Sequence, residues 1–160
     1  MRILIIQPPD LEKEFQAISH HMHRVIPFGP QWDILCLRQY FENRTRHIVD
    51  YLDARLFTSV EAQLTSALSD FEDLQLVVIH CSSEDIGCSA GMIELIKRHQ
   101  PQLKNVLVGS FPTSFPNHAL EIPAVDFVIA GDAERPLQLL ADNLDAVSYT
   151  HLTLPTNREV

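Results

Sequence analysis

Five short segments rich in apolar residues recur along the chain, and polar or small residues follow each of them. Apolar residues at successive positions, rather than at alternate ones, are typical of parallel strands that are buried on both faces. We therefore predict five buried strands. They are Met1–Ile6, His47–Leu52, Leu76–Ile79, Val106–Val108 and Phe127–Ala130.

Segments with the spacing of amphipathic helices separate these strands. Asp33 is the predicted N-cap of the first helix, which ends near residue 43. Thr58 and Glu61 stand three residues apart, as in a capping box, at the start of the second. Asp85 precedes the third helix, and Glu134–Leu144 forms the last. The residues expected on the inward faces of the first three helices are Ile34, Leu37 and Phe41; Val60, Leu64, Ala67, Leu68 and Phe71; and Cys88, Met92, Leu95 and Ile96.

Strands that alternate with helices predict an α/β fold with a five-stranded, doubly wound parallel sheet in three α/β/α layers. The expected strand order is 2-1-3-4-5, as in Rossmann-like and flavodoxin-like sheets. All five strands then end at one edge of the sheet, which is where such folds bind ligands. The loops expected at this edge are Gln7–Gln31, Asp53–Phe57, Cys81–Asp85, Gly109–Pro116 and Gly131–Glu134.

Composition narrows the class of protein. The chain has 160 residues, of which 46% are apolar and 21% charged, as expected for one globular domain. A formal net charge of −9 argues against nucleic-acid binding, which needs clustered Lys and Arg. No apolar run is long enough to span a membrane. The three cysteines lack CxxC spacing and no leader precedes the first strand, so we expect a cytoplasmic protein.

The end of the chain does not continue this pattern. Val147–Thr156 (VSYTHLTLPT) is neither charged nor amphipathic, and it resembles the translation of a transposon-type sequencing adapter. We therefore expect a native domain over residues 1–145 and a non-native tail over residues 146–160. A disordered C-terminus is the alternative.

Few side chains suggest chemistry by their position alone. His20, His21 and His23 lack a partner at zinc-ligand spacing, so solvated loop histidines are expected and no metal site is assigned. His80 ends a buried strand, where a hydrogen-bonded core histidine is the more common outcome. Cys81 has no evident base, although a small α/β enzyme that uses His80 and Cys81 remains an alternative.

Several familiar nucleotide and phosphate motifs are missing from the sequence. Neither GxxxxGK[ST] nor GxGxxG follows the first strand, where QPPDLE stands instead. The aspartate and lysine of a phospho-accepting receiver domain are missing too, because the third strand ends at His80-Cys81 and the fifth at Gly131-Asp132.

Four segments together resemble the N-terminal cobalamin-binding domain of cobalamin-dependent radical S-adenosylmethionine enzymes. They are ILIIQPP at the start, PFGPQWDILCLRQYFENRTRHIVDYLDA, VLVGSFPTSFPNHAL and VDFVIAGDAERPL. The resemblance covers the chain to about residue 145. It implies a Rossmann-like sheet whose carboxyl edge receives a corrin cofactor. It also implies a following barrel domain, absent from this chain, that holds an iron–sulfur cluster and S-adenosylmethionine and performs methyl transfer or a radical rearrangement.

The resemblance also implies which residues would face the cofactor. The family's loop after the third strand matches Cys81, Ser82, Ser83 and Glu84. Its glycine-rich loop after the fourth strand, often GGxHPT, matches Gly109, Ser110, Phe111, Pro112 and Thr113. Its GEGE turn matches Gly131, Asp132 and Glu134, with Ala133 between them. No catalytic residue is implied within this chain.

Three departures from the family pattern keep an alternative open. The DxHxxG loop that supplies an axial histidine in many cobalamin proteins is absent after the first strand, and no CxxxCxxC motif occurs. Ser110 and Phe111 replace a glycine and a histidine, which we expect to change the polarity of the rim. The alternative is a domain of the same fold that binds no cobalamin and serves as a structural or interaction module.

Overall fold

A computed structural model of the chain describes residues 1–9, 32–71, 73–144 and 152–155. The Asp10–Gln31 segment, with His20, His21 and His23, lies outside the described residues. Most of the predicted tail also lies outside them.

The described strands form one parallel sheet in the order β2-β1-β3-β4-β5-β6. The predicted five-stranded order 2-1-3-4-5 is therefore confirmed. The sixth strand was not predicted; it extends the β5 edge of the sheet and comes from the segment that we assigned to a tail. The strands are β1 (Arg2–Gln7), β2 (Ile48–Asp53), β3 (Leu74–His80), β4 (Lys104–Val108), β5 (Phe127–Ala130) and β6 (Leu152–Pro155).

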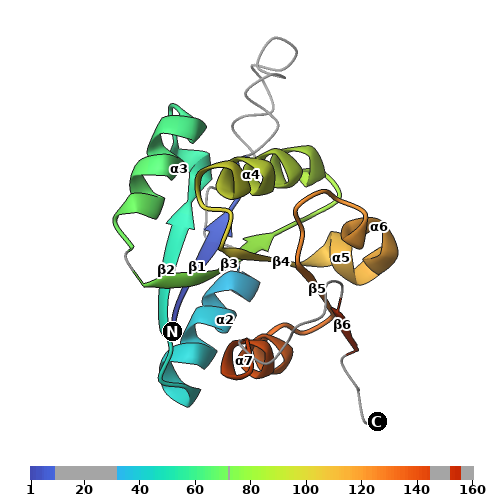
Figure 1. Cartoon of the computed structure of the whole chain (residues 1–160). Coiled ribbons are helices and arrows are strands. Elements are labelled where there is room, and N and C mark those ends of the chain that lie inside the picture. Colours follow the sequence, from blue (N-terminus) through green and yellow to red (C-terminus); the bar gives the residue numbers. More distant parts are fainter. Residues whose placement is uncertain (10–31, 72, 145–151, 156–160) are drawn as a thin grey trace.

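Helices cover both faces of the sheet and give the expected three layers (Figure 1). Helices α2 and α7 lie on one face, and α3 and α4 lie on the other. Among the described residues, none of the helices has the length and apolar character needed to cross a membrane. The helices are α2 (Trp32–Arg44), α3 (Val60–Ser69), α4 (Ile86–His99), α5 (Ser110–Ser114), α6 (Pro116–Leu120) and α7 (Glu134–Asp142), with a 3₁₀ turn at Ala54–Leu56.

Strand residues divide by parity between two cores, because successive side chains of a strand point to opposite faces. On β3, Leu76 and Val78 join the core beneath α2 and α7, whereas Val77 and Ile79 join the core beneath α3 and α4. The predicted inward residues of the first helix are all buried. This alternation also decides the side on which each side chain at the carboxyl edge lies.

The helix starts differ from the two capping predictions. Helix α2 begins at Trp32, so Asp33 lies in its first turn. Helix α3 has Ser59 at its N-cap, with no hydrogen bond from that side chain. Gln63 Oε1 instead accepts from the backbone N–H groups of Thr58 at 2.7 Å and Ser59 at 2.9 Å. The predicted capping box is therefore wrong, because the longer glutamine side chain reaches back over the helix start.

The segment expected as a loop after the fourth strand is largely helical. The two short helices α5 and α6 follow Gly109 and connect β4 to β5. Phe115 ends the first, and Pro116 opens the second, where its missing N–H costs nothing. These two helices carry much of the segment that the family resemblance singled out.

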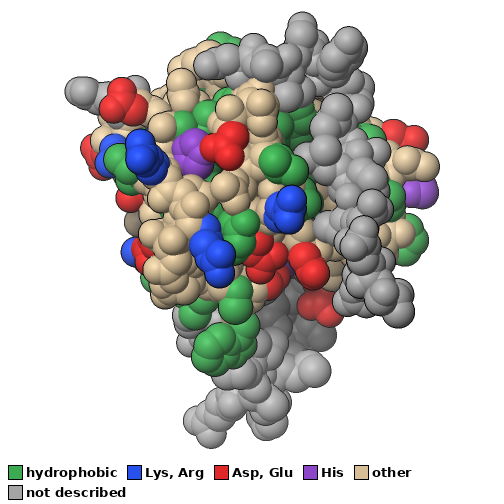
Figure 2. Space-filling view, turned by 90° about the horizontal axis from the view of Figure 1, so that it is seen from below, with side chains coloured by type: hydrophobic (Ala, Val, Ile, Leu, Met, Phe, Trp, Pro, Cys, Tyr) green, Lys and Arg blue, Asp and Glu red, His purple; other side chains and the backbone are tan. Residues whose placement is uncertain are grey.

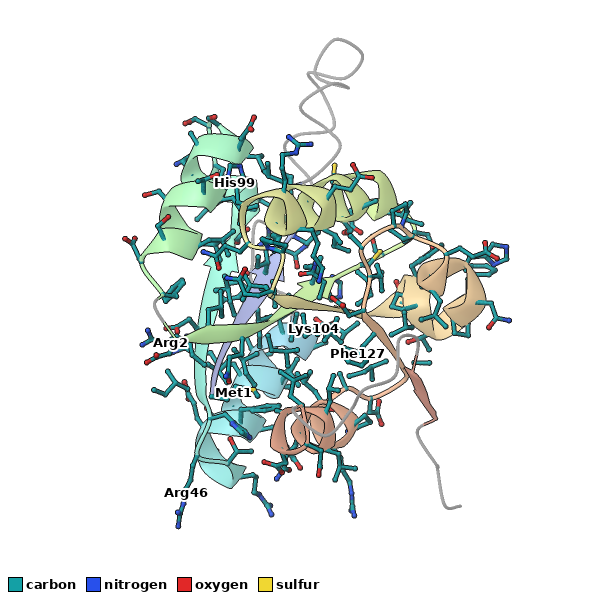
Figure 3. The ribbon with its side chains drawn as sticks, in the orientation of Figure 1. Met1, Arg2, Arg46, His99, Lys104 and Phe127 are labelled. Carbon is teal, nitrogen blue, oxygen red and sulfur yellow. The ribbon has the colours of Figure 1, made fainter. Side chains whose placement is uncertain are left out.

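Asp126 ties the amino ends of β4 and β5 to α4. It accepts from the Asn105 backbone N–H at 2.8 Å and pairs with Lys97 at 2.7 Å and Lys104 at 3.3 Å. Figure 3 labels Arg2, Lys104 and Phe127, the first residues of β1, β4 and β5, which mark the amino edge of the sheet. The candidate site lies at the opposite edge.

Candidate functional site at the carboxyl edge

A histidine–aspartate pair joins β3 to α2 at the carboxyl edge. His80, the last residue of β3, is 3% exposed, and its Nε2 lies 2.8 Å from Asp33 Oδ2. An ionised carboxylate can only accept, so Nε2 carries the hydrogen of this bond. The hydrogen bond from His80 holds the pKa of Asp33 below its usual value. The expectation of a hydrogen-bonded core histidine is confirmed, and its partner comes from 47 residues earlier in the chain.

Two buried polar atoms next to this pair have no partner among the described residues. They are His80 Nδ1 and the Oε1 atom of Gln7, which is 1% exposed at the end of β1. Ile6 pairs with Ile79 across the two strands, so Gln7 and His80 stand at the same level. They also share the α2 face of the sheet, because Ile5 and Val78 belong to that core. The sheet order reverses between β1 and β3, which is where doubly wound folds form their ligand crevice.

Gly109 at the end of β4 allows the chain to pass close to this histidine. Its φ is +116°, a conformation that other residues rarely adopt. A Cβ built there would lie 2.7 Å from the carbonyl oxygen of Cys81 and 3.1 Å from His80 Nε2. The backbone conformation and the close contacts at the end of β4 therefore require a glycine at position 109.

A threonine hydroxyl connects the ends of β4 and β5. Thr113 Oγ1 donates to the Gly109 carbonyl at 2.6 Å and accepts from the Gly131 N–H at 2.9 Å. Gly131 also has a positive φ, of +86°. The Thr113 side chain thus links the backbone at Gly109 to the backbone at Gly131. We refer to these three residues at the carboxyl edge as the rim.

A pocket of about 120 Å³ opens on the α2 side of this rim. Its wall combines residues from α2, the strand ends and the turn before α7. They include Asp33, His80, Gly109, Gly131, Asp132 and Glu134. Four of the predicted site residues, Gly109, Gly131, Asp132 and Glu134, are therefore brought together with the histidine–aspartate pair.

The residues predicted after β3 lie on the other side of the sheet. Cys81 is fully buried beneath α4, and burial raises the pKa of its thiol to about 11. Ser82 is half-buried, and its backbone N–H donates to Asp85 Oδ1 at 2.6 Å. Ser83 and Glu84 are exposed in the turn before α4. Because His80 and Cys81 face opposite sides, the histidine cannot activate the thiol, and the geometry argues against the small enzyme that uses both.

Phe111 does not occupy the rim in the way that we expected. Its half-buried ring packs against the core beneath α4 and lies 5.7 Å from the Phe115 ring. Its backbone N–H donates to the Cys81 carbonyl at 3.1 Å. Pro112 is buried, and Ser110 is exposed at the start of α5. The ring at position 111 therefore stabilises α5 rather than altering the polarity of the pocket.

Sequence reasoning missed Asp33 as a site residue and Gln7 altogether. The signal for Gln7 was a polar residue at the end of an otherwise apolar strand, next to the reversal of strand order. No local signal marks Asp33, because its role depends on how α2 packs across β3. Among the described residues, no group of three or more His, Cys, Asp or Glu side chains is placed to hold a metal ion.

Comparisons with known proteins do not assign the chain to a family. No model of a known protein family matches the chain, and no curated protein is similar to it.

Proposed function

We propose that this chain is the cobalamin-binding module of a cobalamin-dependent radical S-adenosylmethionine enzyme. The observation that carries the proposal is the rim formed by Gly109, Thr113 and Gly131. Glycines with positive φ end these two adjacent strands, and the Thr113 hydroxyl links them, so this part of the carboxyl edge is a fixed turn that presents backbone groups. These are also positions at which the sequence resembles that family.

The described residues fit a corrin that lies across the rim rather than inside the pocket. The pocket holds about 120 Å³, whereas sites for whole cofactors are several times larger. Ser110, at the start of α5 next to Gly109, is exposed, and so is Ser83 in the turn before α4. Cobalamin supplies a cobalt-bound methyl group or a cobalt-centred electron when it is bound. The backbone of 109–113 and 131–134 would position it.

The proposal assigns no axial ligand to this chain. His80 is the one histidine at the described part of the carboxyl edge; its Nε2 contacts Asp33, and its Nδ1 is buried away from the surface. We therefore propose that the lower face of the corrin takes no ligand from His80. Radical chemistry, the iron–sulfur cluster and S-adenosylmethionine belong to a barrel domain in a longer parent chain. The proposal includes a cytoplasmic location, in keeping with three cysteines that, all within the described residues, form no disulfide.

Titration with hydroxocobalamin tests the cofactor directly. Purified protein at micromolar concentration is expected to shift the corrin absorption bands in a saturable way. Ser110→Trp places a bulky ring on the rim and is expected to weaken binding by about tenfold. Asn117→Trp, on the exposed surface of α6, is the matched control and should bind as the wild-type protein does.

Two results would contradict the proposal. The absence of any spectral shift would favour the alternative of a structural or interaction module with the same fold. Equal binding by the Ser110→Trp and wild-type proteins would move the cofactor away from this rim. Sequencing of the parent gene beyond the codon for Asp145 tests the parent enzyme independently, since a downstream CxxxCxxC motif is expected.

A further inference from the structure

The pocket on the α2 side of the rim has many hydrogen-bond acceptors and few donors. With its Nε2 directed at Asp33, His80 has a buried Nδ1 atom without a partner among the described residues. At the mouth, Asp132 is exposed and Glu134 half-buried, so two further carboxylates face the same space. A ligand that donates hydrogen bonds and carries a positive charge would complement these carboxylates.

No cationic side chain in the described part of the chain neutralises these carboxylates. The lysines and arginines that form ion pairs do so elsewhere, with Asp50, Glu42, Asp53 and Asp126. Arg135 is exposed and forms no part of the pocket wall. Figure 2, which looks onto the face covered by α2 and α7, shows acidic, basic and apolar side chains interspersed over that face.

The walls and size of the pocket limit what can enter. The lining also includes three apolar residues, Ile34, Leu37 and Val108. About 120 Å³ accommodates a group of a few heavy atoms, not a whole cofactor. A carboxylate or phosphate group would meet three carboxylates at close range. A neutral alcohol would supply a single donor to a site with several acceptors.

We propose that this pocket binds a primary alkylammonium group, with its charge at Asp132 and Glu134 and its alkyl chain against Ile34, Leu37 and Val108. An ammonium supplies three donors and a positive charge, which matches the acceptors of the pocket. His80, which is buried and hydrogen-bonded to Asp33, forms part of the wall. The inference does not depend on the cobalamin proposal, because it uses the pocket rather than the outer surface of the rim.

The test uses n-butylammonium chloride as the probe and the full chain. Backbone ¹H–¹⁵N spectra report binding through Gly109, Gly131 and Ala133, which line the pocket. We expect saturable shifts of these amides in the millimolar range. 1-Butanol has the same number of heavy atoms and no charge, and it should cause no saturable shift there. Sodium chloride at matched ionic strength corrects for screening.

A pair of double variants separates the pocket from general electrostatics. Asp132→Asn/Glu134→Gln is expected to weaken binding about tenfold, from about threefold for each of the two carboxylates. Asp73→Asn/Glu94→Gln removes the same charge from exposed positions away from the pocket and should leave binding unchanged. Asp132→Asn alone, outside α7, serves if the double variant unfolds.

Three outcomes would overturn the inference. The first is the absence of saturable shifts with n-butylammonium. The second is an equal response to 1-butanol, which would indicate an apolar pocket only. The third is equal weakening by both double variants, which would indicate attraction by the net charge of the protein. None of these outcomes bears on cobalamin binding, so the two proposals are tested separately.

Discussion

Replacement of Gly109 by alanine tests the close packing at the centre of the candidate site. The added Cβ would stand 2.7 Å from the Cys81 carbonyl oxygen and 3.2 Å from the Cys81 backbone nitrogen. Both atoms belong to the backbone, so a side-chain rotation cannot relieve the contact. The site must either move β4 away from β3 or change the conformation of the turn.

The magnitude follows from two separate costs. A non-glycine residue held at φ +116° costs about 1–3 kcal/mol. Overpacking against fixed neighbours costs a further 1–3 kcal/mol or so. The expected loss of unfolding free energy is therefore about 2–6 kcal/mol, a large share of the roughly 5–15 kcal/mol that holds a domain of this size together.

Urea denaturation followed by circular dichroism measures this loss. Gly91→Ala is the matched control, because Gly91 lies within α4 and nothing stands within 4 Å of the place that an added β-carbon would take. Alanine there is expected to raise the unfolding free energy by about 0.5–1 kcal/mol. A loss of less than about 1 kcal/mol for Gly109→Ala would refute the reasoning, because it would mean that the turn relaxes freely.

Three further predictions concern groups whose environment the structure defines. The pKa of Asp33 is lower in the folded protein than its ordinary value of 3.8, so its ionised carboxylate stabilises the fold above pH 3.8. That stability is lost as the pH falls through the folded pKa. Asp33→Asn should therefore flatten the acid limb of a plot of unfolding free energy against pH. His80→Phe should flatten it equally, and a profile unchanged in both variants would contradict the pair. Iodoacetamide at about pH 8 should label exposed Cys36 but not Cys81, because burial raises the pKa of the Cys81 thiol to about 11. Peptide mass spectrometry measures the labelling. Labelling of Cys81 in the folded protein would contradict the prediction. Asp126→Ala should lower the unfolding free energy by about 1–3 kcal/mol in urea, and a neutral result would show that its three contacts are dispensable.

Local pattern was sufficient for the framework of the fold. Continuous apolar runs identified five parallel strands, and the alternation with helices predicted their order, because right-handed crossovers leave few arrangements open. The ends of β4 and β5 at Gly109 and Gly131 were also visible, since a glycine after a buried strand marks a turn. The strand β6 was missed, because Thr153 and Pro155 interrupt the apolar run that marked the other strands, and a proline cannot donate to a strand ladder.

The sequence by itself thus determined the strands, their order and the edge at which a ligand would bind. Tertiary structure decided which side chains meet at that edge. Parity along β3 placed His80 and Cys81 on opposite faces, and the packing of α2 brought Asp33 to His80. The physical reason is that periodicity is a property of neighbouring residues, whereas a contact between segments 47 residues apart depends on how whole elements pack.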